Sequence, residues 1–290
     1  RRQRQMCIRD RCISVGLNSF YVVKAFNKNP FDRVAVFHET KVTAHRGGSS
    51  SAPENTLAAF RHAINDKADY IELDVRQTKD DEIVVIHDAN TRRTTGVDGY
   101  IRNMTLDEVK ELDAGSYFSE EYTGEKIPTL REVLELTQGK ILVNIEIKPT
   151  QYDNDIAGKV VALIEEYGME DECEITSFDY NALKQVKAYN KDIKTGYILS
   201  VAYGRFYDTD EVDFFSMNAS FLSKRLIDAI HKSGKEVYAW TVNNEVSIRN
   251  LSNKGVDNII TDRHVVAKET VLSRDTSETL VNMSRYVFNR

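Results

Sequence analysis

The chain has 290 residues, a formal net charge of −6 and 41% hydrophobic residues. This composition excludes a disordered chain, and the length suits one large α/β domain. Residues 1–12 hold five arginines and one aspartate, so the remainder is clearly acidic, which excludes nucleic acid as the expected partner of the main domain. The three cysteines lack CxxC spacing, so we predict neither a disulfide framework nor a zinc site.

Residues 1–41 form a separate N-terminal segment in this interpretation. Its apolar stretch, residues 13–26, is interrupted by polar side chains and is shorter than the ~20 apolar residues of a membrane-spanning helix. No small-residue cleavage site follows it, so a signal peptide fits poorly. We expect a basic arm that is either juxtamembrane or disordered.

From residue 42 onward, short apolar runs alternate with amphipathic segments, which is typical of strand–helix repeats and a parallel sheet. Eight strands are predicted: Val42–Gly47, Tyr70–Val75, Ile141–Ile147, Cys173–Phe178, Thr195–Leu199, Asp213–Met217, Glu236–Val242 and Asn258–Thr261. Six helices are predicted between them: Thr56–Lys67, Leu130–Thr137, Asp155–Tyr167, Tyr180–Ala188, Lys224–Ser233 and Val246–Lys254. This pattern predicts a (β/α)₈, or TIM, barrel over residues 42–275, followed by a tail at 276–290.

One further apolar run, Ile83–His87, follows the second strand after a link too short for a crossover helix. We therefore expect it to return as a β-hairpin at the barrel mouth. Residues 89–127 are too long for an ordinary connection and are predicted to form an inserted cap beside the site, with a short helix at Leu106–Leu112.

Three carboxylates are placed for metal binding. Glu72 and Asp74 share one face of the second strand, and Glu146 lies near the end of the third. All three are surrounded by apolar residues, where a carboxylate needs a cationic partner. Ligands that are all oxygen favour Mg²⁺ or Ca²⁺ over zinc. The alternative is a set of structural ion pairs.

Two histidines, His45 and His87, lie at the ends of predicted strands and are suited to exchange protons near neutral pH. Arg46 offers a planar fork to phosphate oxygens, and Lys148 offers a point charge. The alternatives are an ordinary ion-paired cation at either position and, for His87, a hairpin residue bonded to Asp88. The other histidines are expected to be structural or solvated: His38, His62, His231 and His264.

Taken together, these motifs resemble the glycerophosphodiester phosphodiesterase family. The motifs are His45-Arg46-Gly47-Gly48, Pro53-Glu54-Asn55-Thr56, Glu72-Leu73-Asp74, His87-Asp88, Glu146-Ile147-Lys148-Pro149 and Trp240-Thr241-Val242-Asn243. The resemblance implies metal-dependent hydrolysis of a glycerophosphodiester to sn-glycerol 3-phosphate and an alcohol. It implies one divalent cation, Ca²⁺ or Mg²⁺, held by the three acids, with the two histidines of the motifs acting as general acid and base.

The resemblance also implies roles around the substrate. Arg46 and Lys148 would bind the phosphate, and Trp240, with Phe178 as a weaker candidate, would wall the glycerol. Glu54 and Asn55 would support the site. Core packing is the alternative for the tryptophan, and helix capping is the alternative for the asparagine.

Three other functions stay open at this point. They are a lysophospholipase D, a phospholipase C-like enzyme on the same barrel, and a silent binding module tethered to a membrane. The cap aromatics Tyr117, Phe118 and Tyr122 are compatible with a lipid substrate. Because some family members carry a membrane region before the catalytic domain, we expect the C-terminal domain of a longer, membrane-associated, bacterial-type protein, and otherwise a cytoplasmic one.

Overall fold

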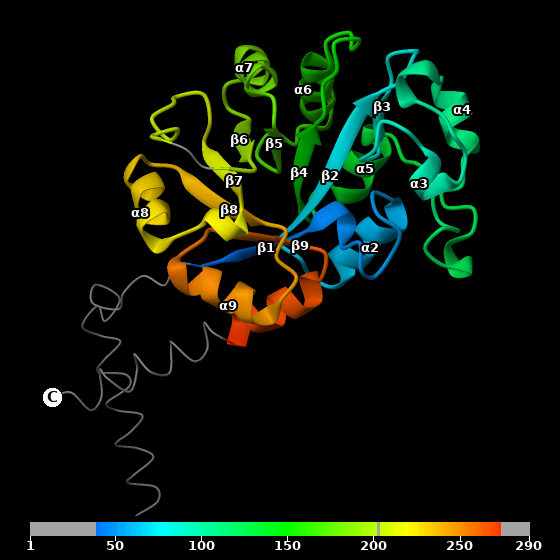
Figure 1. Ribbon diagram of the computed structural model, residues 1–290. Coiled ribbons are helices and arrows are strands. Elements are labelled where there is room, and N and C mark those ends of the chain that lie inside the picture. The colour runs from blue at the N-terminus through cyan, green and yellow to red at the C-terminus, as the bar shows by residue number, and fades with distance from the viewer. Residues whose placement is uncertain (1–38, 202–203, 274–290) are drawn as a thin grey trace, which may run out of the picture. The chain divides into compact units, whose positions relative to one another are not determined.

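Eight parallel strands close into a ring in the computed structural model, which describes residues 39–201 and 204–273 (Figure 1). The ring strands are β1 (Lys41–Ala44), β2 (Tyr70–Gln77), β4 (Leu142–Ile147), β5 (Cys173–Ser177), β6 (Lys194–Leu199), β7 (Phe214–Asn218), β8 (Glu236–Trp240) and β9 (Asn258–Thr261). Strand β1 pairs in parallel with both β9 and β2, which closes the ring. The predicted TIM barrel is confirmed.

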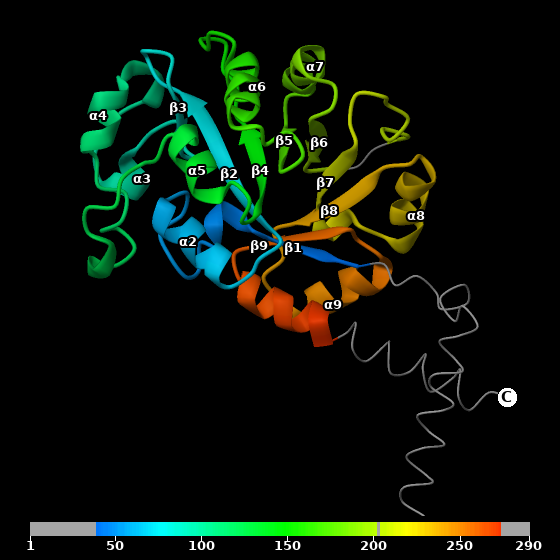
Figure 2. The ribbon, with the colours of Figure 1, turned by 180° about the vertical axis from the view of Figure 1, so that it is seen from behind.

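Helices surround the ring of strands in both views (Figures 1 and 2). They are α2 (Leu57–Asn65), α5 (Leu130–Thr137), α6 (Ile156–Tyr167), α7 (Tyr180–Tyr189), α8 (Lys224–Lys232), α9 (Glu245–Lys254) and a helix at residues 264–273. Polar caps define their starts; for example, Thr129 and Glu132 form a capping box at α5. In the described part of the chain, no helix is both long enough and apolar enough to cross a membrane.

Strand β3 (Ile83–Val85) runs antiparallel to β2 and lies outside the ring, as the hairpin prediction requires. The chain that follows carries α3 (Arg92–Thr95) and α4 (Leu106–Glu111), which lie beside β3 at one side of the barrel in both views (Figures 1 and 2). This inserted cap (residues 89–127) shares a small apolar cluster with the hairpin, which includes Ile101 and Val109 of the cap and Val84 of β3. The cap therefore packs as an addition to the barrel.

The alternation of side chains along the strands separates an apolar layer from a polar interior. On β4, Ile145 and Ile147 belong to the main apolar core. Asn144 lies on the other face, where it is hydrogen-bonded to two residues of the neighbouring strand β5, Glu174 at 3.0 Å and Thr176 at 2.8 Å. The same alternation places the predicted metal ligands of β2 and β4 inside the ring, toward its carboxyl end.

Several predicted strand ends are wrong by one to three residues. Strand β1 ends at Ala44 because His45–Gly47 form a 3₁₀ turn, in which Arg46 and Gly47 have φ angles of 50° and 83°. Strand β3 ends at Val85, two residues before the predicted end. In both cases the backbone turns into a loop before the predicted end of the strand. The predicted N-terminal segment and C-terminal tail lie outside the described residues, apart from residues 39–41, and remain predictions.

Candidate active site

The structure brings the three predicted acids together. Asp74 and Glu146 are register partners on β2 and β4, and Glu72 lies two residues before Asp74 on the same face. All three side chains are buried, and one carboxylate oxygen from each lies within 4.8 Å of the others. We call these residues the acidic cluster. Because its donors are all carboxylate oxygens, the cluster fits a hard divalent cation such as Ca²⁺ or Mg²⁺.

Two cations adjoin the acidic cluster. Lys148 is ion-paired with Glu146, and its Nζ lies 3.1 Å from Asp74 Oδ1; Arg46 Nε lies 3.4 Å from Asp74 Oδ2. Burial acts to raise the pKa of Asp74, but Lys148 and Arg46 outweigh burial and hold this pKa at about 2. Burial and repulsion from Asp74 raise the pKa of Glu146 to about 8. The raised pKa of Glu146 shows that the carboxylates repel one another when all are ionised, and an added cation would relieve that repulsion.

The turn after β1 aims Arg46 at this cluster. Its backbone N–H donates to Glu72 Oε2 at 2.9 Å, and its NH1 donates to Glu54 Oε1 at 2.8 Å. Gly48 closes the turn at φ 90°, where an added Cβ would lie only 2.2 Å from the ring of His264. Glycine is therefore required there for both backbone conformation and space.

Asn55 orients one of the acids. Its Nδ2 donates to Asp74 Oδ2 at 2.8 Å, and its Oδ1 accepts from the Asp74 backbone N–H at 3.3 Å. The N-cap of α2 is Thr56, whose side chain accepts from the Ala59 N–H. The capping alternative for Asn55 is therefore wrong, and this side chain is hydrogen-bonded to Asp74 of the cluster instead.

His45 is held by a residue that the sequence analysis missed. Its Nδ1 lies 2.6 Å from Asp262 Oδ1, and its Nε2 lies 3.9 Å from Glu72 Oε2. Asp262 also accepts from Ser49 Oγ at 2.7 Å and from Asn243 Nδ2 at 2.6 Å. Burial acts to lower the pKa of His45, but the two carboxylates outweigh it and raise this pKa. The signal for Asp262 was an acidic residue directly after the last barrel strand.

His87 is held in a similar way by Asp88, which is itself bonded to Arg93 in the cap, a second residue that the sequence analysis missed. Its Nδ1 lies 2.7 Å from Asp88 Oδ1, while Arg93 donates to Asp88 Oδ2 at 2.6 Å and to both oxygens of Glu54 at 2.7 and 2.8 Å. The Asp88 bond that was the alternative explanation for His87 is thus present. Burial lowers the pKa of His87 despite the nearby carboxylates. In both histidines a carboxylate lies within hydrogen-bond distance of Nδ1, so Nε2 is the ring nitrogen that this contact leaves unused.

The remaining described histidines have partners away from the acidic cluster. His231 Nε2 lies 2.9 Å from Asp257, and His264 Nε2 lies 2.9 Å from Asp66. His62 lies 3.3 Å from the hydroxyl of Tyr122 in the cap. These contacts agree with the structural roles expected for them; His38 lies outside the described residues.

Trp240 and Phe178 meet at the barrel mouth. Their ring centroids are 5.9 Å apart in an edge-to-face arrangement. Trp240 also packs against the inner apolar group of Phe214, Tyr238 and Ile260, whereas Phe178 is 49% exposed. Core packing is therefore part of the role of Trp240, and its predicted contact with substrate remains a prediction.

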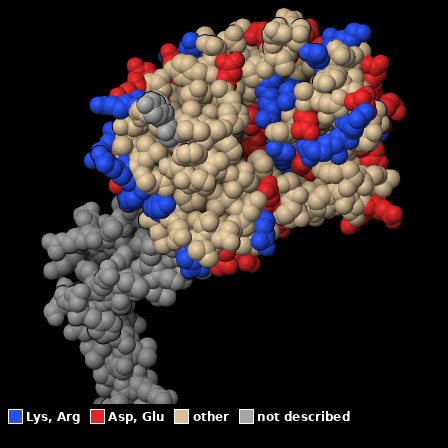
Figure 3. All heavy atoms as spheres, viewed as in Figure 1, with Lys and Arg blue, Asp and Glu red and all other residues tan. Residues whose placement is uncertain are grey.

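A cavity of about 650 Å³ adjoins the cluster between the ends of β4, β5 and β6. Glu146 and Lys148 line one part of it, and Phe178, Tyr180 and Tyr197 line another. On the face drawn in Figure 3, acidic and basic side chains gather around a hollow beside a broad uncharged area. The cavity likewise combines charged and apolar walls.

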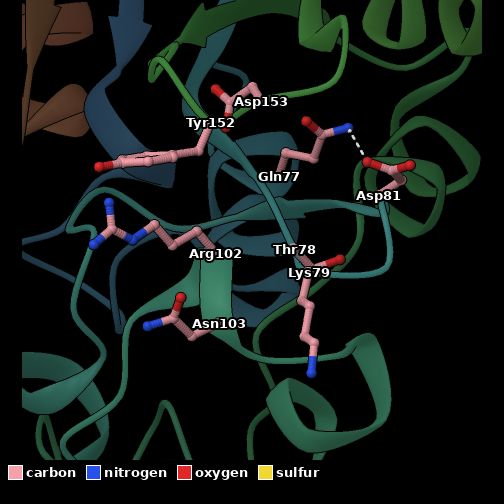
Figure 4. A pocket seen from close by; sticks show the side chains of 8 residues that line it. All are labelled: Gln77, Thr78, Lys79, Asp81, Arg102, Asn103, Tyr152 and Asp153. Carbon is pink, nitrogen blue, oxygen red and sulfur yellow. Dashed lines mark hydrogen bonds between the residues drawn. The ribbon is translucent and has the colours of Figure 1, made fainter.

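A second cavity, of about 300 Å³, lies between the β2–β3 turn, the cap and the loop after β4 (Figure 4). Gln77 donates to Asp81 at 3.1 Å there, and Arg102 lies 4.4 Å from the ring centre of Tyr152. Gln77 faces the opposite side of β2 from the acidic cluster. Because no predicted site residue lines this cavity, it does not form part of the candidate active site.

Comparisons with known proteins agree with this geometry. A glycerophosphodiester phosphodiesterase of Caldanaerobacter subterraneus is 38% identical over 253 residues, which cover 85% of this chain and 98% of the relative. A phosphodiesterase of Oleispira antarctica, solved in complex with the product sn-glycerol-3-phosphate, is 32% identical with a TM-score of 0.73, over 80% of this chain and 96% of that one. A glycerophosphodiester phosphodiesterase of Agrobacterium tumefaciens is 30% identical with a TM-score of 0.69, over 79% and 99% of the two chains.

The family match covers the barrel and the whole candidate site. Residues 45–266 match the model of the glycerophosphoryl diester phosphodiesterase family, from the first predicted catalytic histidine to the helix after β9. The chain therefore belongs to the glycerophosphoryl diester phosphodiesterase family, a family of phosphoric diester hydrolases.

Proposed function

We propose that this chain hydrolyses glycerophosphodiesters to sn-glycerol 3-phosphate and an alcohol, with one divalent cation, Ca²⁺ or Mg²⁺. The observation that carries the proposal is the buried acidic cluster beside two cationic side chains, in a chain of this family. The Oleispira relative, solved with sn-glycerol-3-phosphate, supports the choice of product.

The phosphate would be bound from two sides. Glu72, Asp74 and Glu146 would hold the cation, and a bound cation supplies positive charge that polarises the phosphate. Lys148 adds a point charge at the same edge, and Arg46 presents a planar group with several N–H donors. Glu54 and Asn55 support these groups through the hydrogen bonds to Arg46 and Asp74.

Proton transfer would be divided between the two histidines. One of His45 and His87 deprotonates the nucleophile, and the other protonates the leaving alkoxide. Each is suited to this work because a carboxylate holds its Nδ1 and leaves Nε2 for the reacting oxygen. The nucleophile is either water or the 2-hydroxyl of the substrate's glycerol; the second route passes through a cyclic phosphate.

The two halves of the substrate have different surroundings in this proposal. Trp240, with Phe178 beside it, would pack on the carbons of the glycerol. The cavity next to Glu146 and Lys148 has room for the alcohol. A small, water-soluble diester therefore suits the site.

A substrate panel tests the proposal. Release of glycerol 3-phosphate is measured from glycerophosphocholine, glycerophosphoethanolamine and lysophosphatidylcholine, with and without a chelator. We expect cleavage of the deacylated diesters and its loss on chelation. A clear preference for lysophosphatidylcholine would instead identify a lysophospholipase D, and absence of turnover on every diester with either cation would favour a silent binding module. The membrane tether expected through a further N-terminal region remains a prediction, and the basic arm at residues 1–38 lies outside the described part of the chain.

A further inference from the structure

Arg93 belongs to the inserted cap, yet its guanidinium group reaches back to two carboxylates of the site. Its Nε donates to Asp88 Oδ2 at 2.6 Å. Its NH1 and NH2 donate to the two oxygens of Glu54 at 2.8 and 2.7 Å. All three bonds are charge-assisted, and the pair with Glu54 is bidentate. Only a guanidinium group has the donor geometry to make all of them at once.

Each of these two carboxylates also contacts a residue with a role in the proposed function. Asp88 Oδ1 lies 2.7 Å from Nδ1 of His87, and Glu54 Oε1 accepts from Arg46 NH1 at 2.8 Å. Arg93 therefore links Asp88, the partner of His87, to Glu54, the partner of Arg46. If Arg93 moves, both partners lose a fixed position.

The cap has contacts with the rest of the chain that do not involve Arg93. The backbone N–H of Glu54 donates to the hydroxyl of Tyr117 at 3.0 Å, and the N–H of Ala58 donates to Glu125 at 3.0 Å. The cap also packs against Val84 and Ile86 of the hairpin in a shared apolar cluster. The neighbouring Arg92 forms only an exposed pair inside the cap, with Asp98 at 2.8 Å, of a kind that contributes little to stability.

We propose that Arg93 is a positioning residue of the active site, which orients His87 through Asp88 and Arg46 through Glu54. This inference rests on the proposed function, because the roles of His87 and Arg46 come from it. Lysine in place of Arg93 carries the same charge but cannot bond both carboxylates in the same fork. The cap then contributes to the active site through the side chain of Arg93.

Kinetics of three variants test this proposal, with glycerophosphocholine as substrate. For Arg93→Lys and Arg93→Ala we expect kcat to fall by about 10- to 100-fold, the usual effect of removing a group that orients a reacting residue. KM is expected to change less than kcat. The matched control, Arg92→Lys, lies on the same short helix and is expected to keep wild-type kinetics. A kcat for Arg93→Lys within about twofold of wild type would overturn the proposal, because that ratio is well under the tenfold step expected.

Chemical rescue separates positioning from a structural role. Guanidinium chloride, at concentrations far below those that unfold the protein, is expected to restore part of the kcat of Arg93→Ala and to leave Arg92→Lys unchanged. If Arg93→Ala does not fold, Arg93→Lys carries the test. Absence of rescue in a folded Arg93→Ala variant would count against the proposal.

A third measurement does not depend on turnover. The downfield NMR signal of the His87 Nδ1 proton is expected in wild type and Arg92→Lys and is expected to be lost or broadened in Arg93→Ala. An unchanged signal would overturn the proposal even if no diester were cleaved. Absence of cleavage by the wild type would instead contradict the proposed function, so the two failures are distinguishable.

Discussion

Asp262→Asn replaces the carboxylate beside His45 by an amide of the same shape. Three donors converge on Asp262 in the wild type: His45 Nδ1 and Ser49 Oγ on one oxygen, and Asn243 Nδ2 on the other. An amide has one accepting end and one donating end. Whichever way the new amide is turned, its NH2 group therefore faces a neighbouring donor.

The surrounding bonds decide which way the new amide turns. Asn243 cannot reverse its own amide without losing the bonds that its Oδ1 accepts from Thr261 Oγ1 at 3.0 Å and from the backbone N–H of residue 262 at 2.9 Å. His45 can change tautomer, and the hydroxyl of Ser49 can rotate, so both can become acceptors. The amide nitrogen should therefore face His45 and move the imidazole proton from Nδ1 to Nε2.

The expected result is a large kinetic effect with a small effect on stability. Leaving two donors opposed costs about 1–3 kcal/mol, and changing the tautomer of His45 avoids most of that cost. A proton-transfer group in the wrong tautomer is expected to lower kcat by about 10²–10⁴, the range for loss of a positioned acid or base. In the matched variant Asp257→Asn, the altered carboxylate is the partner of His231, and kcat should be unchanged even if the melting temperature falls.

Release of glycerol 3-phosphate gives kcat and KM for the two variants, and a thermal melt of each checks folding. Nitrogen NMR shifts of His45 report which ring nitrogen carries the proton. Wild-type kcat in a folded Asp262→Asn variant would refute the reasoning. So would a large loss of kcat with the proton still on Nδ1, because the loss would then have another cause.

Four further predictions follow from the site and the barrel interior. Chelation is expected to abolish turnover, and cation at about 100 times its Kd should raise the melting temperature by roughly 5–11 °C; full activity with no metal detected by elemental analysis would contradict this. His45→Ala and His87→Ala should each lower kcat by about 10²–10⁴, whereas His231→Ala should not; equal losses in kinetic assays of all three, at equal stability, would be the contrary result. Trp240→Ala should weaken binding of the glycerol unit by about 1–3 kcal/mol, measured through KM for glycerophosphocholine. Burial raises the pKa of Glu174 from 4.5 to about 8. Between these values the folded state keeps a proton that the unfolded state loses, so the free energy of unfolding falls as pH rises through this window. Glu174→Gln should remove that fall, and an equal loss of stability between pH 5 and pH 8.5 in wild type and Glu174→Gln, measured by thermal melts, would contradict the prediction.

The sequence alone was enough to predict the barrel and the acidic cluster. Strand faces follow from local alternation, so Glu72 and Asp74 had to share a face wherever the strand was placed. The short link after β2 excluded a crossover helix and required the hairpin. Because barrel strands all end at one edge, the predicted Glu146 was expected to lie near the other two acids, and it does.

Only the tertiary structure decided what holds the reactive groups in place. Asp262 lies 217 residues after His45 in the chain and reaches it because β9 pairs with β1 when the ring closes. Arg93 reaches Glu54 because the cap folds back against the loop before α2. Asn55 resembled a helix cap in the sequence but bonds Asp74, because its left-handed backbone turns its side chain toward β2. Local sequence pattern fixes which face a side chain occupies, whereas pairs between distant segments depend on ring closure and loop packing, which no local pattern records.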